Sequence, residues 1–265
     1  MAITTLSGLQ AASGSAQWCS VFKATQTGDR AGVWHSLWGA AGYPPAGNTS
    51  VQRPTNTTVG AIPFTNPGGG QLSHLLRLAV SGTVNGSLIL YDRLWHNAGM
   101  SGTQTVEVAV PGSLFVNRPD DTGFRTELWG QIYSALGSTD STLFVKYTDQ
   151  DGNLDQQAFY VKEVAGDLDT VGQMFPLQLA SGDTGVGRAS DYRWSGSTGA
   201  VGDFGLVLMR RLVEVPLTAD GVECLYDFAR LGLPRIYDNA CLTPMVRLSS
   251  TSTGAVFCRL MIGAG

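Results

Sequence analysis

From residue 71 onward, the sequence is a succession of short apolar runs separated by turn residues. Residues 103–110 and 124–136 alternate between polar and apolar side chains, which is the period of a half-buried strand. The other runs cover 72–81, 87–92, 142–148, 156–164, 173–179, 187–194, 203–215, 245–249 and 255–262. Their close spacing leaves no room for the helices of βαβ units. We therefore predict an all-β fold, an antiparallel β-sandwich of the jelly-roll kind.

Two turn sequences predict hairpins between neighbouring runs. Asn85-Gly86 lies between two apolar runs, and an Asn-Gly pair in that position is the strongest short hairpin signal. The second turn is the polar segment 149–153, which separates the runs 142–148 and 156–164. Both turns predict that the strands on either side pair with each other.

The second turn also resembles a calcium loop. Acidic or amide residues stand at alternate positions, but the twelfth position holds Tyr160 instead of glutamate. The flanking segments are predicted strands, whereas an EF-hand needs helices. We favour a plain hairpin over a weak calcium site formed by Asp149, Asp151, Asn153 and Asp155.

Residues 1–70 differ in composition and pattern from the β-sandwich domain predicted for 71–265. Asn, Thr, Pro and Gly dominate 46–70, so we predict an extended N-terminal arm. Within it, 18–22 suits a short strand. One short helix is predicted at 219–231, where an apolar stripe begins near Asp220 and ends before Gly232.

Charge and composition narrow the classes of function. Only 14% of the residues are charged, and 17 basic against 21 acidic residues give a net charge of −4. Duplex nucleic acid needs a basic footprint, and a membrane span needs about 18 apolar residues in a row, so neither partner is expected. The N-terminus lacks the pattern of a secretory signal, which predicts synthesis in a host cytoplasm. The four cysteines are then expected to be reduced.

The sequence nominates no catalytic or cofactor motif. Residues 195–199 come near the Gly-x-Ser-x-Gly elbow without matching it, and the glycine-rich 182–187 lacks the lysine of a phosphate loop. His35, His74 and His96 are too far apart for a local metal motif. We expect a protein that is not an enzyme and needs no cofactor or metal.

Mixed aromatic and arginine segments are the remaining candidates for function. Trp, Tyr and Arg contribute much of the binding energy of protein–protein interfaces. Exposed tryptophans equally suit a sugar-stacking platform, so a glycan-binding module stays an alternative. The interface candidates are Trp34, Trp38, Tyr91, Arg93, Trp95, His96, Tyr192, Trp194, Arg235 and Tyr237.

Three blocks of sequence resemble a family of tailed-bacteriophage virion structural proteins. In chain order they are Tyr91-Asp92-Arg93-Leu94-Trp95-His96-Asn97, Gly182-Asp183-Thr184-Gly185-Val186 and Pro234-Arg235-Ile236-Tyr237-Asp238-Asn239. The resemblance covers the middle of the chain and extends toward its C-terminus.

The resemblance implies a β-rich structural part of a virion. The role we favour is a capsid decoration, or cement, protein that binds the major capsid protein or other virion proteins and forms homo-oligomers. Such a protein would bridge capsomers on the outside of the shell, and a polar arm would lie across neighbouring subunits. A tail, neck-adaptor or head-fibre component is the alternative within the same class.

Overall fold

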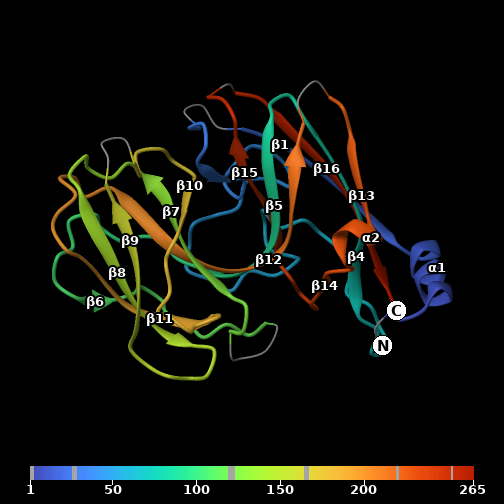
Figure 1. The fold of residues 1–265 in the computed structure, drawn as a ribbon, viewed down its shortest axis with the longest axis horizontal. Coiled ribbons are helices and arrows are strands. Elements are labelled where there is room, and N and C mark those ends of the chain that lie inside the picture. The colour runs from blue at the N-terminus through green and yellow to red at the C-terminus, as the bar shows by residue number, and fades with distance from the viewer. Residues whose placement is uncertain (1–2, 26–28, 119–122, 164–166, 219–220, 252) are drawn as a thin grey trace.

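The computed structural model describes residues 3–25, 29–118, 123–163, 167–218, 221–251 and 253–265 (Figure 1). Strands dominate these residues and only two helices accompany them. The elements are α1 (Leu6–Gly14), β1 (Gln17–Ala24), β2 (Trp34–Ser36), β3 (Gly42–Tyr43), β4 (Ser73–Gly82), β5 (Gly86–His96), β6 (Val108–Ala109), β7 (Glu127–Ser134), β8 (Ser141–Asp149), β9 (Gln156–Lys162), β10 (Gln173–Pro176), β11 (Val186–Trp194), β12 (Asp203–Leu217), β13 (Cys224–Asp227), α2 (Phe228–Leu231), β14 (Arg235–Ile236), β15 (Leu242–Leu248) and β16 (Ala255–Ala264).

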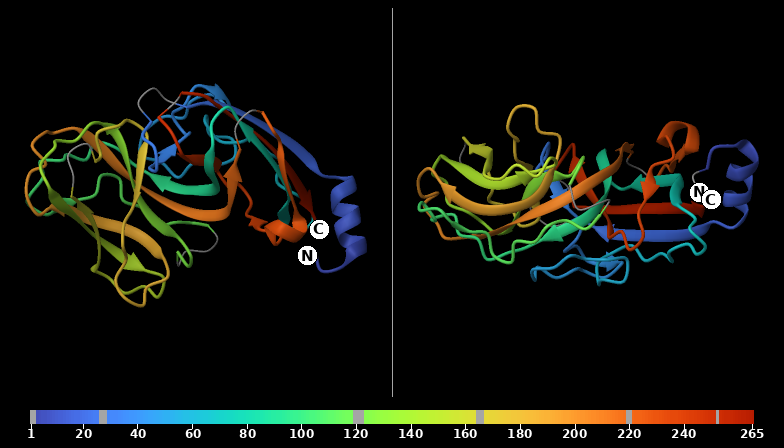
Figure 2. Two further views of the ribbon diagram at one scale, coloured as in Figure 1. Left: turned by 45° about the horizontal axis from the view of Figure 1, so that its top comes forward. Right: turned by 90° about the horizontal axis from the view of Figure 1, so that it is seen from below.

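The strands form a closed barrel with a sheet on either side of it. The barrel has the order β10-β2-β15-β5-β12-β7. The wide sheet has the order β13-β4-β16-β1-β3, with β14 beside β4, and the narrow sheet has the order β6-β11-β8-β9. Figures 1 and 2 show an elongated molecule in which the two sheets lie at opposite ends. The fold confirms the predicted all-β, antiparallel class.

Three hydrophobic cores hold these layers together, and β5 contributes to all of them. Its Leu88 and Leu90 pack between the barrel and the wide sheet. Its Ile89 joins a core to which all six barrel strands contribute, which places that core inside the barrel. Its Leu94 and Trp95 pack between the barrel and the narrow sheet. The molecule thus has two lobes, a wide-sheet lobe and a narrow-sheet lobe, which meet at the barrel. The long strand β12 pairs with β5 along this path, so two paired strands run through both lobes.

The N-terminal 70 residues are part of the fold, which corrects the predicted separate arm. β1, where the sequence predicted a strand, pairs with β16 from Gln17↔Ile262 to Ala24↔Ala255. It also pairs with β3, so it lies inside the wide sheet. Val21, Leu37, Ile62 and Phe64 are buried in the core below that sheet. The boundary at residue 70 is wrong because these apolar side chains need the rest of the chain to cover them.

One predicted hairpin is confirmed and the other is wrong. β8 and β9 pair from Ser141↔Lys162 to Tyr147↔Gln156, with the turn at 149–153 between them. By contrast, β4 belongs to the wide sheet and β5 to the barrel, so the chain changes sheets at Asn85-Gly86. A Cβ on Gly86 would lie 2.2 Å from the Arg247 carbonyl oxygen. Glycine is needed there for close approach to β15, and the hairpin signal was misleading.

The predicted helix at 219–231 is a short strand followed by a single helical turn. Ala219 and Asp220 lie outside the described residues. Residues 224–227 form β13, because pairing with β4 satisfies their backbone groups, and α2 is a single turn that ends at Gly232 as predicted. A second helix, α1, escaped the sequence analysis although Thr5 caps it by accepting a hydrogen bond from the Gly8 N–H. Within the described residues, no helix has the length and apolarity to cross a membrane.

Candidate functional site

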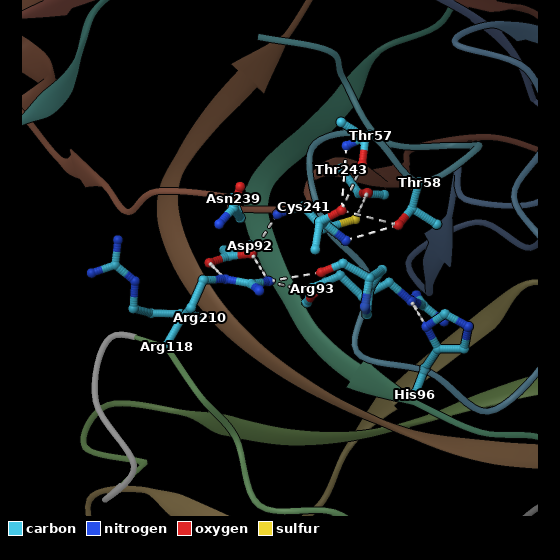
Figure 3. A network of polar contacts seen from close by, with 12 residues as sticks. Thr57, Thr58, Asp92, Arg93, His96, Arg118, Arg210, Asn239, Cys241 and Thr243 are labelled. Atoms are coloured by element: carbon cyan, nitrogen blue, oxygen red, sulfur yellow. Dashed lines mark hydrogen bonds and ion pairs between the residues drawn. The ribbon is translucent and has the colours of Figure 1, made fainter. Parts of the chain in front are cut away.

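The first sequence block lies at the junction of the two lobes. Every residue from 91 to 97 is buried, on the part of β5 that passes from one core to the next. Figure 3 shows the polar side chains that gather around it. They form a network that joins β5 to three segments distant in sequence.

An ion pair between Asp92 and Arg118 is the centre of this network. The Arg118 Nη2 and Nε donate to the Asp92 carboxylate at 2.9 and 3.2 Å. The same carboxylate accepts from the Cys241 backbone N–H at 2.8 Å, and Arg118 Nη2 also donates to the Pro54 carbonyl at 3.0 Å. Both charged side chains are nearly inaccessible to solvent. The pair therefore joins β5 to three other segments, those that contain Arg118, Pro54 and Cys241.

Arg93 is fully buried and its hydrogen-bond partners are neutral. Its Nε donates to His96 Nδ1 at 2.9 Å and its Nη2 donates to Gln131 Oε1 at 2.8 Å. Its guanidinium carbon lies 5.0 Å from the centre of the Trp38 ring, in cation–π geometry. Two tyrosine hydroxyls, those of Tyr91 and Tyr133, accept its remaining bonds. These contacts tie β5 to β7 and to the segment after β2.

His96 is neutral in this environment. Its burial and the neighbouring Arg93 charge lower its pKa to about 2. Because Nδ1 accepts from Arg93, the ring proton is on Nε2, close to the backbone carbonyls of Asn48 and Ser50. The ring is thus a structural hydrogen-bonding group whose two nitrogens are both engaged.

A second histidine forms a buried pair with an aspartate. His35 Nδ1 lies 3.0 Å from Asp29, and its Nε2 accepts from the Arg30 backbone N–H at 3.0 Å. A catalytic dyad needs that second nitrogen free to take a proton from a nucleophile. His74 Nδ1 lies 3.0 Å from the Leu233 carbonyl. All three histidines therefore have structural partners.

The calcium-loop residues close a turn. Asp149 Oδ1 accepts from the backbone N–H groups of Asp151 and Asn153, and its Oδ2 accepts from the Asn153 amide. This is the arrangement of a plain hairpin turn. Across the part of the chain that the structure describes, no cluster of three or more His, Cys, Asp or Glu side chains is placed to hold a metal ion.

Most of the predicted interface residues lie in the interior, and this corrects their assignment. A side chain buried within its own chain has no surface to offer a partner. Their aromatic and arginine character reflects the cores and the junction network. The buried candidates are Trp38, Tyr91, Arg93, Trp95, His96, Tyr192 and Trp194.

The other three candidates lie at the surface. Trp34 is half-buried, and the Arg247 guanidinium carbon lies over its ring, 4.9 Å from the ring centre. Arg235 is exposed, and its guanidinium carbon lies 4.1 Å from the centre of the Tyr237 ring, with Arg210 at 4.5 Å. Figure 3 shows Arg210 and Asn239 in the same polar network as Asp92, so the structure brings the first and third sequence blocks together. The second block lies in the other lobe, where Asp183 accepts from the Tyr147 hydroxyl.

The structure exposes an apolar surface that the sequence analysis missed. Four aromatic side chains on the outer side of the wide sheet are about half exposed: Trp18, Phe22, Tyr43 and Phe257, at 54%, 41%, 53% and 43%. We call them the aromatic face. The rings of Phe22 and Phe257 lie 5.0 Å apart. The strand at 18–22 contained a signal for this surface, because apolar residues occur on both of its faces. Trp18 and Phe22 lie on one face, and the buried Cys19 and Val21 lie on the other.

Comparison with known proteins yields no relative for the chain. No family model and no curated protein matches it. Among solved structures, the VP2 subviral particle of infectious bursal disease virus aligns with 94% of this chain and 80% of VP2, at 8% identity and a TM-score of 0.19. The T13 particle of the same virus aligns with 94% of this chain and 77% of its own, at 8% identity and a TM-score of 0.20. Scores this low establish no common fold and carry no inference about function.

Proposed function

We propose that this chain is a structural protein of a virus particle, and specifically a capsid decoration protein that binds the outside of the shell. Its mechanism is to cover apolar and aromatic surface against neighbouring virion proteins. Many weakly binding copies act together on a shell because each new contact is intramolecular once the first has formed. No chemical step belongs to this role.

The aromatic face is the observation that carries the proposal. Half-exposed large rings on a sheet mark a surface that another protein covers, because water-exposed apolar area of this kind is unfavourable. The charged fraction of 14% is low for a surface that faces only water. The buried junction network supports the same role, since it holds the two lobes as one rigid body.

The resemblance of the three sequence blocks to virion proteins of tailed bacteriophages supports this reading. In this fold the first block supplies the junction network, and the third supplies Arg235 and Tyr237, which stack with Arg210. A tail, neck-adaptor or head-fibre component is built from the same kind of contacts, so the position on the particle separates these roles.

The test is the position and copy number of the protein in a particle reconstruction. A decoration protein is expected on the outer surface, in numbers close to those of the shell subunit. A ring of about six or twelve copies at one vertex would contradict the decoration role and favour a neck or tail component. Absence from purified particles would contradict the virion role altogether.

The glycan-binding alternative is weakened by the burial of the tryptophans. Trp38, Trp95, Trp129 and Trp194 are buried, and only Trp18 is largely exposed. A sugar-stacking platform on this chain would therefore use the aromatic face. A change in Trp18 fluorescence on titration with glycans would favour this alternative.

A further inference from the structure

We infer that the occupant of the aromatic face is a second copy of this chain, so that the protein is a dimer joined through its wide sheets. The inference deepens the proposed function by naming a partner for that face. It places the narrow-sheet lobes at the outer ends of the dimer.

The first argument is the layout of the face. Strand register aligns its outward side chains in three rows: Tyr43, Phe22, Phe257 and Ser81; Ser20, Arg259, Ala79 and Leu225; Trp18, Met261, Arg77 and Asp227. The first row carries three large rings, whereas Ser20, Ser81 and Ala79 are small. A hollow of about 490 Å³ lies over these small residues, beside the paired rings.

A surface with a ridge and a hollow side by side complements a copy of itself. In a twofold contact, the same patch on each copy meets the other, so the ridge of each fills the hollow of its partner. Two sheets packed face to face lie about 10 Å apart, a distance that interdigitated large and small side chains fill.

The second argument is charge. The face carries two basic residues, Arg77 and Arg259, and two acidic ones, Glu223 and Asp227. Arg259 and Glu223 already pair at 2.9 Å. The face is therefore balanced, although the chain as a whole has a net charge of −4. Two copies can approach through it without repulsion, and a strongly charged partner would find no complementary field.

The third argument is area. A large aromatic side chain has roughly 150–250 Å² to bury, so four half-exposed rings offer roughly 300–500 Å². A standard interface covers about 800 Å² on each partner, of which a little over half is apolar. The aromatic face with its serine, arginine and acidic neighbours has the size and the polar fraction of such an interface.

The experiment is sedimentation of the full chain over a wide range of concentration. We expect the wild type to be a dimer that dissociates on dilution. The double variant Phe22→Ser/Phe257→Ser should weaken association at least about thirtyfold, as loss of central aromatic contacts does. The control is Val106→Ser/Leu154→Ser, which removes two apolar side chains that are still more exposed, 70% and 66% accessible, from the narrow-sheet lobe. The control should remain a dimer.

A second variant guards against a folding defect. Ser20→Arg places a large charged group at the middle of the face without removing any core contact, and it should also be monomeric with an unchanged circular dichroism spectrum. A wild type that stays monomeric throughout, or variants that still dimerise, would overturn the inference. A monomer that is nonetheless found on particles would leave the proposed function intact, and a dimer absent from particles would overturn that function alone.

Discussion

Arg118 and Asp92 form a buried ion pair, and the two residues are the point where the lobes of the molecule are joined. The arginine comes from the segment after β6, and the aspartate lies in the middle of β5. The two hydrogen bonds between them, at 2.9 and 3.2 Å, are shielded from solvent. Breaking one side of such a pair leaves an uncompensated charge in the interior.

Replacing Arg118 should therefore be costly. We expect Arg118→Met to lower the free energy of unfolding by about 3–5 kcal/mol, measured by urea denaturation. The control is Arg211→Met, whose pair with Glu127 is about one-third exposed, and it should cost about 1 kcal/mol or less. The double variant Asp92→Asn/Arg118→Met should recover part of the loss, because it removes both charges of the pair. Equal effects of Arg118→Met and Arg211→Met would contradict the buried role of the pair.

The sequence predicted this strand but not the role of its polar residues. Alternation and turn residues are local properties, so β7, β11, β12 and the β8–β9 hairpin were predictable from the sequence. His96 pairs through its backbone with Gln52, and Arg93 donates to Gln131, and both partners lie far away in the chain. An arginine beside aromatic residues looks the same in a sequence whether it lies in a core or at an interface. For the same reason, β1 and Ile62 gave no sign that they belong to the central fold.

Lys23 should make stability depend on alkaline pH. Its Nζ is buried and donates to the carbonyls of Ala40 and Pro45 at 3.0 and 3.4 Å, and burial lowers its pKa to about 8. Between pH 8 and the ordinary pKa of 10.5, the unfolded chain holds a proton that the folded chain has lost, so the contribution of Lys23 to stability rises with pH. Three buried thiols act in the opposite sense, because burial raises the pKa values of Cys19, Cys241 and Cys258 above their ordinary value and the unfolded chain loses those protons first. The effect of Lys23 is therefore measured as a difference between the wild type and a variant that keeps the thiols and lacks this amine.

The measurement is the denaturation midpoint between pH 7.5 and about 9.5, with Lys23→Met as the comparison. The variant should be more stable than the wild type at neutral pH, and this advantage should shrink as the pH rises, because the amine of the wild type loses its proton. An advantage that stays constant from pH 7.5 to about 9.5 would contradict a lowered pKa for Lys23.

Gly205 should tolerate no side chain. A Cβ at this position in β12 would lie 1.9 Å from the Asn97 carbonyl oxygen, and that residue's side chain accepts from the Leu206 N–H at 2.7 Å. We expect Gly205→Ala to cost about 1–3 kcal/mol of stability by forcing β12 away from its neighbour. Gly196→Ala is the matched control, since a Cβ there meets nothing within 4 Å. Thermal unfolding of both variants tests the difference, and a neutral Gly205→Ala would contradict it.

The chain should tolerate the removal of α1 but not the removal of β1. Removing residues 1–15 deletes a helix that packs through Leu9 and Ala12 onto Leu76 of β4 without supplying a strand to the wide sheet, so the chain should still fold. Removing residues 1–24 also deletes β1 and exposes β16 and the core behind it, so that chain should be insoluble. The yield of soluble protein and the sharpness of its thermal transition measure both. A soluble, cooperatively folding 25–265 fragment would restore the idea of a dispensable arm.

The passage of β5 and β12 through both lobes sets how the molecule responds to force. The two strands pair from Gly86↔Leu217 to His96↔Val207, and this ladder crosses the junction where many two-lobed proteins have a linker. The ladder continues on both sides of two register shifts, at Leu208/Met209 and Arg211/Val213. A pull on one lobe is therefore carried to the other along two continuous strands rather than through a single-chain linker.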